Sequence, residues 1–441
     1  MLTPEYLQKI TDKSESLAAG LKEYIIKRIV RSIMVRLQRG EEFTLSQTNM
    51  WNIQTLQESD ELLADIMKEI KKQTAESNKV VKKAFKDAGI TALRYEDAEY
   101  EAAGLAAAIG TKMSPEYIRI LERNYEATKG ELKNLTGTIA KAAQVTFIDA
   151  CDEALFKVQT GTCSRSQAVK EAIDKTVKEG GMVIYPSGHK DTVETATLRA
   201  VRTGIAKAAG DIALKRMAEM DVWAVLTSAH VGARSTPIPE PANHESWQGQ
   251  VFYVDLVKLG LAKEYTKEAE RARSLHPDFI EKTGYGTGEG ILGWNCRHSI
   301  GTWIDGVSKN NYKKIDTEEN KKAYDLQQAQ RKLERTIRKW KIQKNGYKEA
   351  MDKAEDDETR EALDAQHQKA KEKVAYYNKK YGQFCEENDL KPQYDRLYVG
   401  DPAKKVIDKS EVKAYNMDIR ICLTSPEGNL ITQYLPSREV N

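Results

Sequence analysis

The sequence predicts a mainly α-helical protein whose central part is an α+β domain. Apolar residues recur at helical spacing in the first and last parts of the chain, whereas short β-type runs gather in the middle and in the tail. The charged fraction of 31% is high beside a hydrophobic fraction of 40%, which is typical of long helices that face solvent. With 441 residues, the chain is long enough for two or three domains.

Residues 1–155 are predicted to be an N-terminal helical region. Thr3 is expected to cap the first helix, with Pro4 in its first turn. One apolar stripe repeats every four residues: Leu21, Ile25, Ile29, Ile33 and Leu37. Breaks between helices are expected near Gly40, near Gly89, near Gly110 and at Ser114-Pro115.

Two interpretations of this region stay open. It is a helical bundle with an ordinary core, or it is an arm that docks on a large partner. Trp51, Tyr95 and Tyr100 stand beside polar stretches, and such aromatic residues are favoured anchors at interfaces. The same side chains equally fit the core of a bundle.

Residues 156–310 mix both kinds of structure and are predicted to be an α+β domain. A helix is expected from Ser164 onward and another over Val193–Glu219. Three strands are expected at Met182–Tyr185, Trp223–Thr227 and Val251–Val254.

Residues 311–390 are predicted to be a charged helical hairpin, with helices over 318–388 and a turn at Asp356-Asp357-Glu358. The first arm is basic, and its positive charge is interpreted either as a solvated coiled-coil face or as a contact for double-stranded DNA. The candidate DNA-contact residues are Arg331, Arg335, Arg338 and Lys339. Residues 391–441 form a tail with an expected β-hairpin, Ile419–Leu423 and Leu430–Leu435.

Net charge, cysteine distribution and the length of apolar segments exclude several classes of protein. A net charge of +3 is too small for a general polycation, so any DNA contact must come from local patches. The five cysteines are dispersed, which fits a reducing compartment and argues against a disulfide framework. No signal peptide is expected, and no segment approaches the ~18 uninterrupted apolar residues of a membrane helix.

Polar and reactive side chains are concentrated in two blocks, residues 244–249 and 293–298, the second preceded by a glycine-rich run. The favoured interpretation is a structural cluster of hydrogen bonds that locks the loop. Its candidate residues are Arg234, His244, Trp247, Gln248, Gly249, Gly284, Gly286, Gly293, Asn295, Cys296, Arg297 and His298.

Two chemical alternatives remain for these blocks. A hydrolase or nuclease-like enzyme would use Cys296, His298 and His244, since a neighbouring cation or imidazole lowers a thiol pKa. A metal site would use the same residues with His230, but zinc needs about four ligands and the sequence has one close pair. Neither a metal nor a cofactor is therefore expected, and no catalytic residue is assigned.

The ordered motifs Trp223–Ser228, Ala233-Arg234-Ser235, His244–Phe252, Gly284-Tyr285-Gly286 and Asn295–His298 resemble those of the tailed-phage minor capsid protein 2 family. That family is similar to the head-morphogenesis proteins typified by the F protein of phage Mu. Upstream, Val201-Arg202-Thr203 also fits. One departure is that His298 stands where a second cysteine often occurs.

The resemblance implies a virion structural protein rather than an enzyme. Such proteins lie in the capsid interior after assembly in the host cytoplasm, and they associate with the portal protein. They assist head assembly and DNA packaging or ejection, with scaffold and major capsid proteins as further partners. A cytosolic coiled-coil adaptor is the remaining alternative, and the ordered motif set argues against it.

Overall fold

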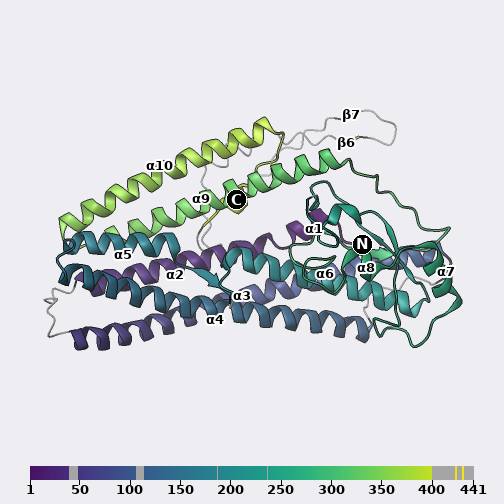
Figure 1. The fold of residues 1–441 in the computed structure, drawn as a ribbon, viewed down its shortest axis with the longest axis horizontal. Coiled ribbons are helices and arrows are strands. Elements are labelled where there is room, and N and C mark those ends of the chain that lie inside the picture. The colour runs from purple at the N-terminus through teal and green to yellow at the C-terminus, as the bar shows by residue number, and fades with distance from the viewer. Residues whose placement is uncertain are drawn as a thin grey trace, which may run out of the picture. The chain divides into compact units, whose positions relative to one another are not determined.

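The computed structural model describes residues 1–38, 48–105, 114–185, 187–235, 237–399, 423–424 and 430–431. The chain divides into two compact units, Met1–Gly400 and Asp401–Asn441. Long helices dominate the first unit and its strands are short, so the predicted fold class is confirmed (Figure 1). The predicted boundaries near residues 155 and 310 fall inside this unit, and independent folding of the parts stays a prediction.

The N-terminal region consists of helices α1 (Pro4–Lys9), α2 (Asp12–Gln38), α3 (Thr48–Ala102) and α4 (Pro115–Gln159). The predicted first cap is confirmed, because Thr3 Oγ1 accepts a hydrogen bond from Tyr6 N at 3.1 Å. Ser114 caps α4 in the same way, through Tyr117 N. The expected breaks near Gly40 and Gly110 lie outside the described residues.

The expected break at Gly89 is wrong, because α3 continues through this residue without interruption. A glycine inside a helix costs about 1 kcal/mol relative to alanine, which tertiary packing readily exceeds. Phe85, Ala88 and Ala92 surround the glycine on α3 and are all buried. Burial of this helix face therefore decides the structure here.

Two of the three aromatic residues proposed as interface anchors lie in the interior, and the third, Tyr95, is partly buried. Trp51 is 5% exposed, and the Arg36 guanidinium carbon lies 3.8 Å from its ring centre. Tyr100 is fully buried and its hydroxyl lies 2.8 Å from Thr302 Oγ1. Trp51 and Tyr100 are core residues, so the interpretation of these two as docking anchors is wrong.

Helix α6 (Val193–Glu219) is the centre of the first unit and contacts α2, α3 and α4. Val201, Ile205 and Ile212 on α6 are all fully buried. Gly204 permits a close approach of the helices, since a Cβ there would collide with Thr128 Oγ1 on α4. Helix α5 (Arg165–Glu179) lies against α4 and α2.

A three-stranded antiparallel sheet has the order β4-β3-β5, with β3 (Ala224–Thr227), β4 (Val251–Tyr253) and β5 (Ile300–Thr302). The sequence predicted β3 and β4 but missed β5. Strand β1 (Met182–Ile184) was also predicted, and it pairs with an unpredicted β2 (Lys190–Thr192). Two short helices, α7 (Lys267–Leu275) and α8 (Phe279–Thr283), and the 3-10 turn η2 (His244–Ser246) connect these elements.

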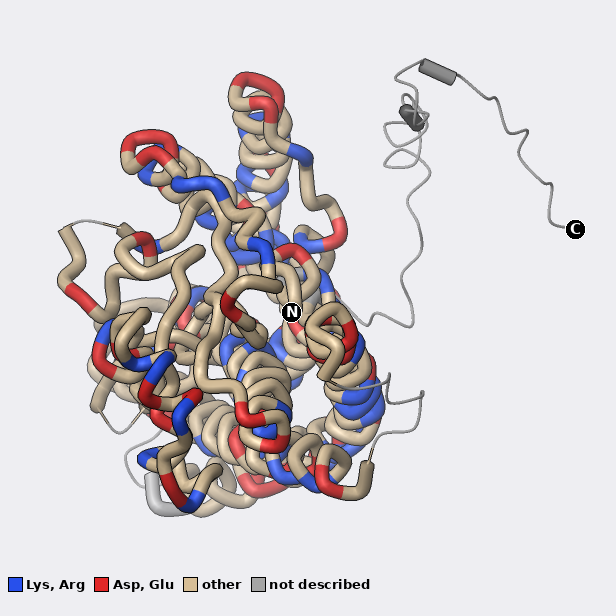
Figure 2. The backbone as a smooth tube through the Cα atoms, turned by 90° about the vertical axis from the view of Figure 1, so that its right-hand side faces the viewer, with Lys and Arg blue, Asp and Glu red and all other residues tan. Residues whose placement is uncertain are grey.

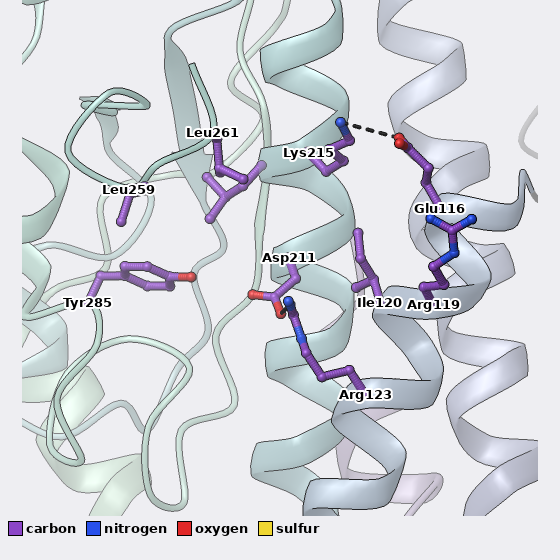
Figure 3. A pocket seen from close by; sticks show the side chains of 10 residues that line it. Glu116, Arg119, Ile120, Arg123, Asp211, Lys215, Leu259, Leu261 and Tyr285 are labelled. Atoms are coloured by element: carbon purple, nitrogen blue, oxygen red, sulfur yellow. Dashed lines mark hydrogen bonds and ion pairs between the residues drawn. The ribbon is translucent and has the colours of Figure 1, made fainter. Parts of the chain in front are cut away.

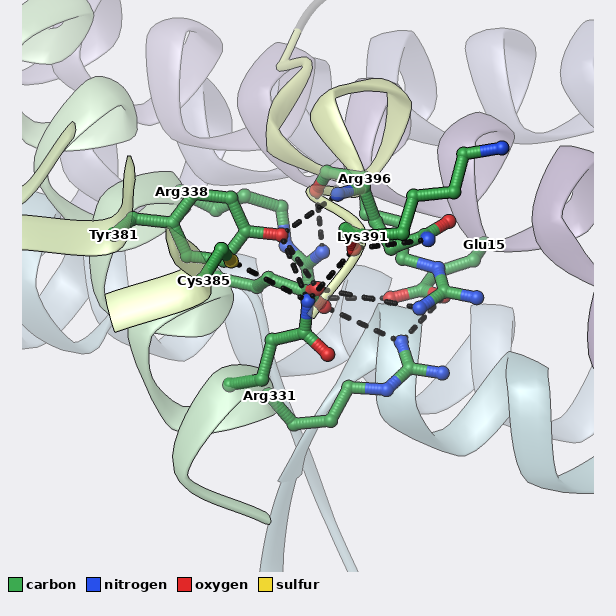
Figure 4. Close-up of polar contacts among 10 residues, drawn as sticks. Glu15, Arg331, Arg338, Tyr381, Cys385, Lys391 and Arg396 are labelled. Carbon is green, nitrogen blue, oxygen red and sulfur yellow. Dashed lines mark hydrogen bonds and ion pairs between the residues drawn. The ribbon is translucent and has the colours of Figure 1, made fainter. Parts of the chain in front are cut away.

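Helices α9 (Thr317–Met351) and α10 (Asp357–Glu387) form the predicted hairpin, and Asp356 caps α10. Helix α9 also contacts α2 and α5. A polar network joins α9 to α10 and to η3 (Tyr394–Leu397): the Tyr381 hydroxyl donates to Glu334 Oε1 at 3.1 Å (Figure 4). Part of the basic arm is therefore packed against neighbouring elements.

In the second unit, β6 (Leu423–Thr424) and β7 (Leu430–Ile431) pair in antiparallel register. The rest of the predicted hairpin strands, residues 419–422 and 432–435, lies outside the described residues. Figure 2 shows that positions with Lys and Arg alternate with positions with Asp and Glu along the described elements of the first unit. Within the described parts of the chain, no helix is long and apolar enough to cross a membrane.

Candidate functional site

The two blocks singled out in the sequence meet at a cavity of about 460 Å³. Its walls come from α6, the segment 230–234, η2, the glycine-rich loop 284–298 and helix α9. Seven arginines line it: Arg199, Arg202, Arg234, Arg297, Arg331, Arg335 and Arg338. Glu15 and Glu289 are the acidic residues among the lining, so positive charge is in clear excess.

Glycines set the path of the loop that forms one wall. Gly284 adopts φ +61° and ends α8 in the left-handed conformation, and Gly286 adopts φ +93°. A Cβ at Gly293 would collide with the backbone of Gly288. Glycine is the residue that tolerates both demands without strain.

Two predicted cluster residues hold this loop to its surroundings. Arg297 Nη2 donates to Gly232 O at 3.1 Å and to Gln327 Oε1 at 2.9 Å, so it ties the loop to the segment 230–234 and to α9. Arg234 Nη2 donates to Trp294 O at 2.6 Å. These bonds match the predicted locking role.

Two neighbours depart from that interpretation. Asn295 is exposed and stands at φ +58°, a left-handed conformation that asparagine tolerates better than most residues. Trp294, beside it in the same block, is 59% exposed and therefore does not anchor the loop by burial. Trp247, by contrast, is 2% exposed and its Nε1 donates to Pro241 O at 2.9 Å.

The predicted histidines gather around Trp247. His298 stacks on His230 with ring centres 4.6 Å apart, and its ring centre lies 5.3 Å from that of His244. Gln248 Oε1 accepts from His230 N at 3.0 Å and lies 3.2 Å from His298 Nε2. Gly249, at φ +66°, closes the block, and its carbonyl accepts from Asn310 Nδ2 at 2.8 Å.

These imidazoles are neutral at physiological pH. Burial, followed by the Arg297 charge, lowers the pKa of His230 to about 3. Burial and Arg234 lower the pKa of His244 to about 4. Burial also holds the pKa of His298 well below its usual value. The positive charge of the cavity therefore belongs to its arginines.

His244, Cys296 and His298 bring one potential metal-ligand atom each within 4.8 Å of one another, and all three residues are buried. His244 Nε2 already lies 2.8 Å from Glu289 O, and Cys296 Sγ lies 3.6 Å from His298 Nδ1. Zinc favours about four ligands, and the described residues supply three at this place. Arg234 and Arg297, which lower the pKa of His298, would also repel a cation.

This arrangement does not favour catalysis by the Cys296 thiol. Burial raises the pKa of Cys296 above its usual value, so the sulfur remains a thiol at neutral pH. A nucleophilic cysteine needs the thiolate and access to a substrate, whereas Cys296 is 1% exposed. The contacts of Cys296 and its histidine neighbours are ring packing and hydrogen bonds, which is what the structural interpretation expects.

The basic residues of α9 differ in their contacts: some form ion pairs inside the protein and others are exposed. Arg338 Nη2 pairs with Glu15 Oε1 at 3.1 Å and its Nη1 donates to Arg396 O at 2.6 Å. Arg331 Nη1 lies 3.4 Å from Glu334 Oε2 (Figure 4). Arg335 and Lys339 are exposed on α9. Arg331 and Arg338 are thus engaged inside the protein, whereas Arg335 and Lys339 are exposed, so both interpretations of the basic arm stay open for these two residues.

Sequence reasoning missed the contribution of α2 and α6 to this site. Glu15, Arg199 and Arg202 come from these helices, far along the chain from the two blocks. The available signal was Val201-Arg202-Thr203, a segment that fits the family resemblance. Helical periodicity alone assigns such a residue to a solvated face, because it cannot show which distant loop covers it.

A second cavity, of about 380 Å³, lies between α4, α6 and the loop residues Leu259, Leu261 and Tyr285 (Figure 3). Four of its five charged residues are paired: Arg123 Nη2 contacts Asp211 Oδ2 at 2.8 Å, and Lys215 Nζ contacts Glu116 Oε2 at 3.2 Å. The fifth, Arg119, is exposed, so this cavity has a much smaller excess of positive charge than the first.

Comparisons with known proteins agree with a structural role. The chain is 28% identical over 253 residues to a structural protein of Lactococcus phage LL-H, over 57% of this chain and 60% of that protein. It is 44% identical over 61 residues to a structural protein of Lactococcus phage mv4, over 14% of this chain and 50% of that protein. The aligned parts thus span half to three fifths of these relatives. No solved structure matches the chain.

These relatives and the family match indicate the class: a structural protein of a phage. The family model for phage minor capsid protein 2 matches residues 2–375, and the chain belongs to this family. The resemblance stated from the sequence motifs is thereby confirmed.

Proposed function

We propose that this minor capsid protein lies inside the capsid, associates with the portal and assists head assembly and DNA packaging or ejection. The observation that carries the proposal is the family match over residues 2–375. Assembly would take place in the host cytoplasm, where scaffold and major capsid proteins are the further partners. No turnover is needed for this role.

The portal contact is assigned to the N-terminal helical region, residues 1–155. Three large apolar side chains are exposed there, two on α3 and one on α4: Ile53 at 53%, Leu56 at 54% and Val145 at 55%. Gln144 Nε2, next to Val145, joins the two helices through Asp60 Oδ1 at 2.8 Å. Exposed apolar side chains with a polar rim are typical of protein interfaces.

Point variants test this assignment without removing helices from the core. The full chain would be co-expressed with the portal protein of the same phage, as wild type and as Leu56→Glu with Val145→Glu. Leu275→Glu is the matched control, since Leu275 on α7 is 56% exposed. Loss of co-purification in the double variant, with retention in the control, supports the proposal. Retention in both contradicts the assigned contact.

A DNA contact is the second part of the proposal. Arg335 and Lys339 stand four residues apart on α9 and are exposed, which places both on one helix face. Such a face would meet the phosphate backbone without reading sequence.

A further inference from the structure

None of the hydrogen bonds and ion pairs described above involves Arg202. Its side chain belongs to α6, is 5% exposed and lines the arginine-rich cavity. Among the residues that the structure describes, its Nε and Nη2 atoms have no hydrogen-bond partner. Buried arginines are nearly always paired, because a guanidinium that leaves water loses its hydration energy unless new hydrogen bonds or ion pairs offset the loss.

Neighbouring arginines increase the free-energy cost of burying the Arg202 charge. Burial, followed by the charges of Arg331 and Arg297, lowers the pKa of Arg202 to about 9, which still leaves it charged at neutral pH. The hydrogen bonds that Arg297 and Arg234 make go to neutral oxygens. Glu15 is shared between Arg331 and Arg338. The cavity thus holds several cations and too few anions.

We propose that this cavity is a binding site for a phosphate group, held by Arg202 together with Arg297 and Arg331, which also line it. A guanidinium offers parallel N–H donors that match two phosphate oxygens, and a phosphate with several oxygens engages more than one arginine. The cavity volume of about 460 Å³ lies within the usual size of small-molecule sites, roughly 300–1,000 Å³.

The position of the site gives the ligand a structural effect. The cavity is walled by α6, the glycine-rich loop and α9, so an anion there would bridge elements that otherwise repel one another through their arginines. Two sources supply a phosphate group of suitable charge: a free oligophosphate such as a nucleotide, and the 5′-phosphate at a DNA end. The inference does not depend on portal association.

The test measures the binding of phosphate compounds to the full chain, with thermal melting and titration calorimetry as the two readouts. The probes are pyrophosphate, a nucleoside triphosphate, and two short duplexes that differ in a 5′-phosphate or a 5′-hydroxyl. The wild type should show a saturable rise in Tm with at least one phosphate probe. Arg202→Gln should weaken that binding about tenfold or more, whereas Arg119→Gln, an exposed arginine of the second cavity, should not.

Melting without a probe separates this role from a structural one. Arg202→Gln removes an unpaired charge, so the ligand-free variant should melt at or above the wild-type temperature. Preference for the 5′-phosphorylated duplex over the 5′-hydroxyl duplex would identify a DNA end as the source, and binding of the small probes alone would identify a free oligophosphate. Absence of any phosphate-dependent shift in the wild type, or an equal shift in Arg202→Gln, overturns the proposal.

Discussion

Arg338 on α9 pairs its Nη2 atom with Glu15 Oε1 on α2 at 3.1 Å, and each side chain is 8% exposed. The pair joins residues near opposite ends of the first unit's sequence. It also gives Arg338 a role in packing, which makes it a poor candidate for a DNA contact.

Loss of one partner of this pair should be costly. Arg338→Ala leaves the Glu15 carboxylate buried with less compensation, so the free energy of unfolding should fall by about 3–5 kcal/mol. The exposed pair Lys348–Asp352 on the same helix is the control, and Lys348→Ala should change stability by less than about 1 kcal/mol. Chemical denaturation of both variants measures the difference. Equal free energies of unfolding for the Arg338→Ala and Lys348→Ala variants would show that the buried pair does not stabilise the protein more than the exposed one.

Arg297 and Asn295 should respond differently to substitution. Arg297→Ala removes bonds to Gly232 O and Gln327 Oε1 and should destabilise the protein by about 1–3 kcal/mol. Asn295→Ala should cost roughly 1 kcal/mol through its left-handed φ alone, and Asn295→Gly should restore stability. Thermal melts check both. If Asn295→Gly were as damaging as Asn295→Ala, backbone conformation would not explain this position.

No tightly held metal is predicted at His244, Cys296 and His298. The three donors already lie within hydrogen-bonding distance of neighbours, and nearby arginines oppose a cation. Elemental analysis of dialysed protein should find well under one zinc per chain. Stoichiometric zinc that is lost in Cys296→Ser would contradict this prediction and make these residues ligands.

DNA binding should be weak, independent of sequence and sensitive to salt. Arg335→Glu with Lys339→Glu should abolish retardation of duplex DNA at low salt, since each lost phosphate contact removes roughly one unit of log–log salt slope. Lys321→Glu with Lys322→Glu changes the net charge equally on exposed positions of the same helix and should retain binding. Loss of retardation in both variants alike would indicate a general charge effect instead.

Stability should fall as the pH drops below about 6.5. The folded-state pKa of His244 is depressed to about 4, so its contribution is present above its unfolded pKa of 6.5 and is lost as the pH falls toward 4. At pH 5 the loss from this residue is about 2 kcal/mol. His244→Gln should therefore reduce the difference in unfolding free energy between pH 7 and pH 5 by that amount. An unchanged pH dependence in the variant would argue against a buried neutral His244.

The sequence predicted much of the helical fold because long helices repeat their apolar residues regularly. Helix α6 was predicted with its observed bounds, and Thr3 was identified as a cap. Strand β5 was missed because Ile300-Gly301-Thr302 is too short to show alternation. Its pairing depends on β3, whose partner across Leu226 is Gly301.

The candidate site was predicted in part. His298 and Arg297 were recognised because a glycine-rich loop concentrates them in sequence, and His244 because it opens the polar block 244–249. Arg202 and Glu15 were not, because their place in the cavity follows from the packing of α2, α6 and α9. Local patterns do not encode that three-dimensional arrangement.

Cross-linking of intact filled heads tests the central claim, portal association inside the capsid, most directly. Exposed lysines lie on α3 and α4: Lys68, Lys71, Lys72 and Lys141. A lysine-reactive cross-linker that enters the capsid, followed by mass spectrometry, should join these lysines to the portal protein. Abundant links from the same lysines to tail or outer-surface proteins, with none to the portal, would contradict the account.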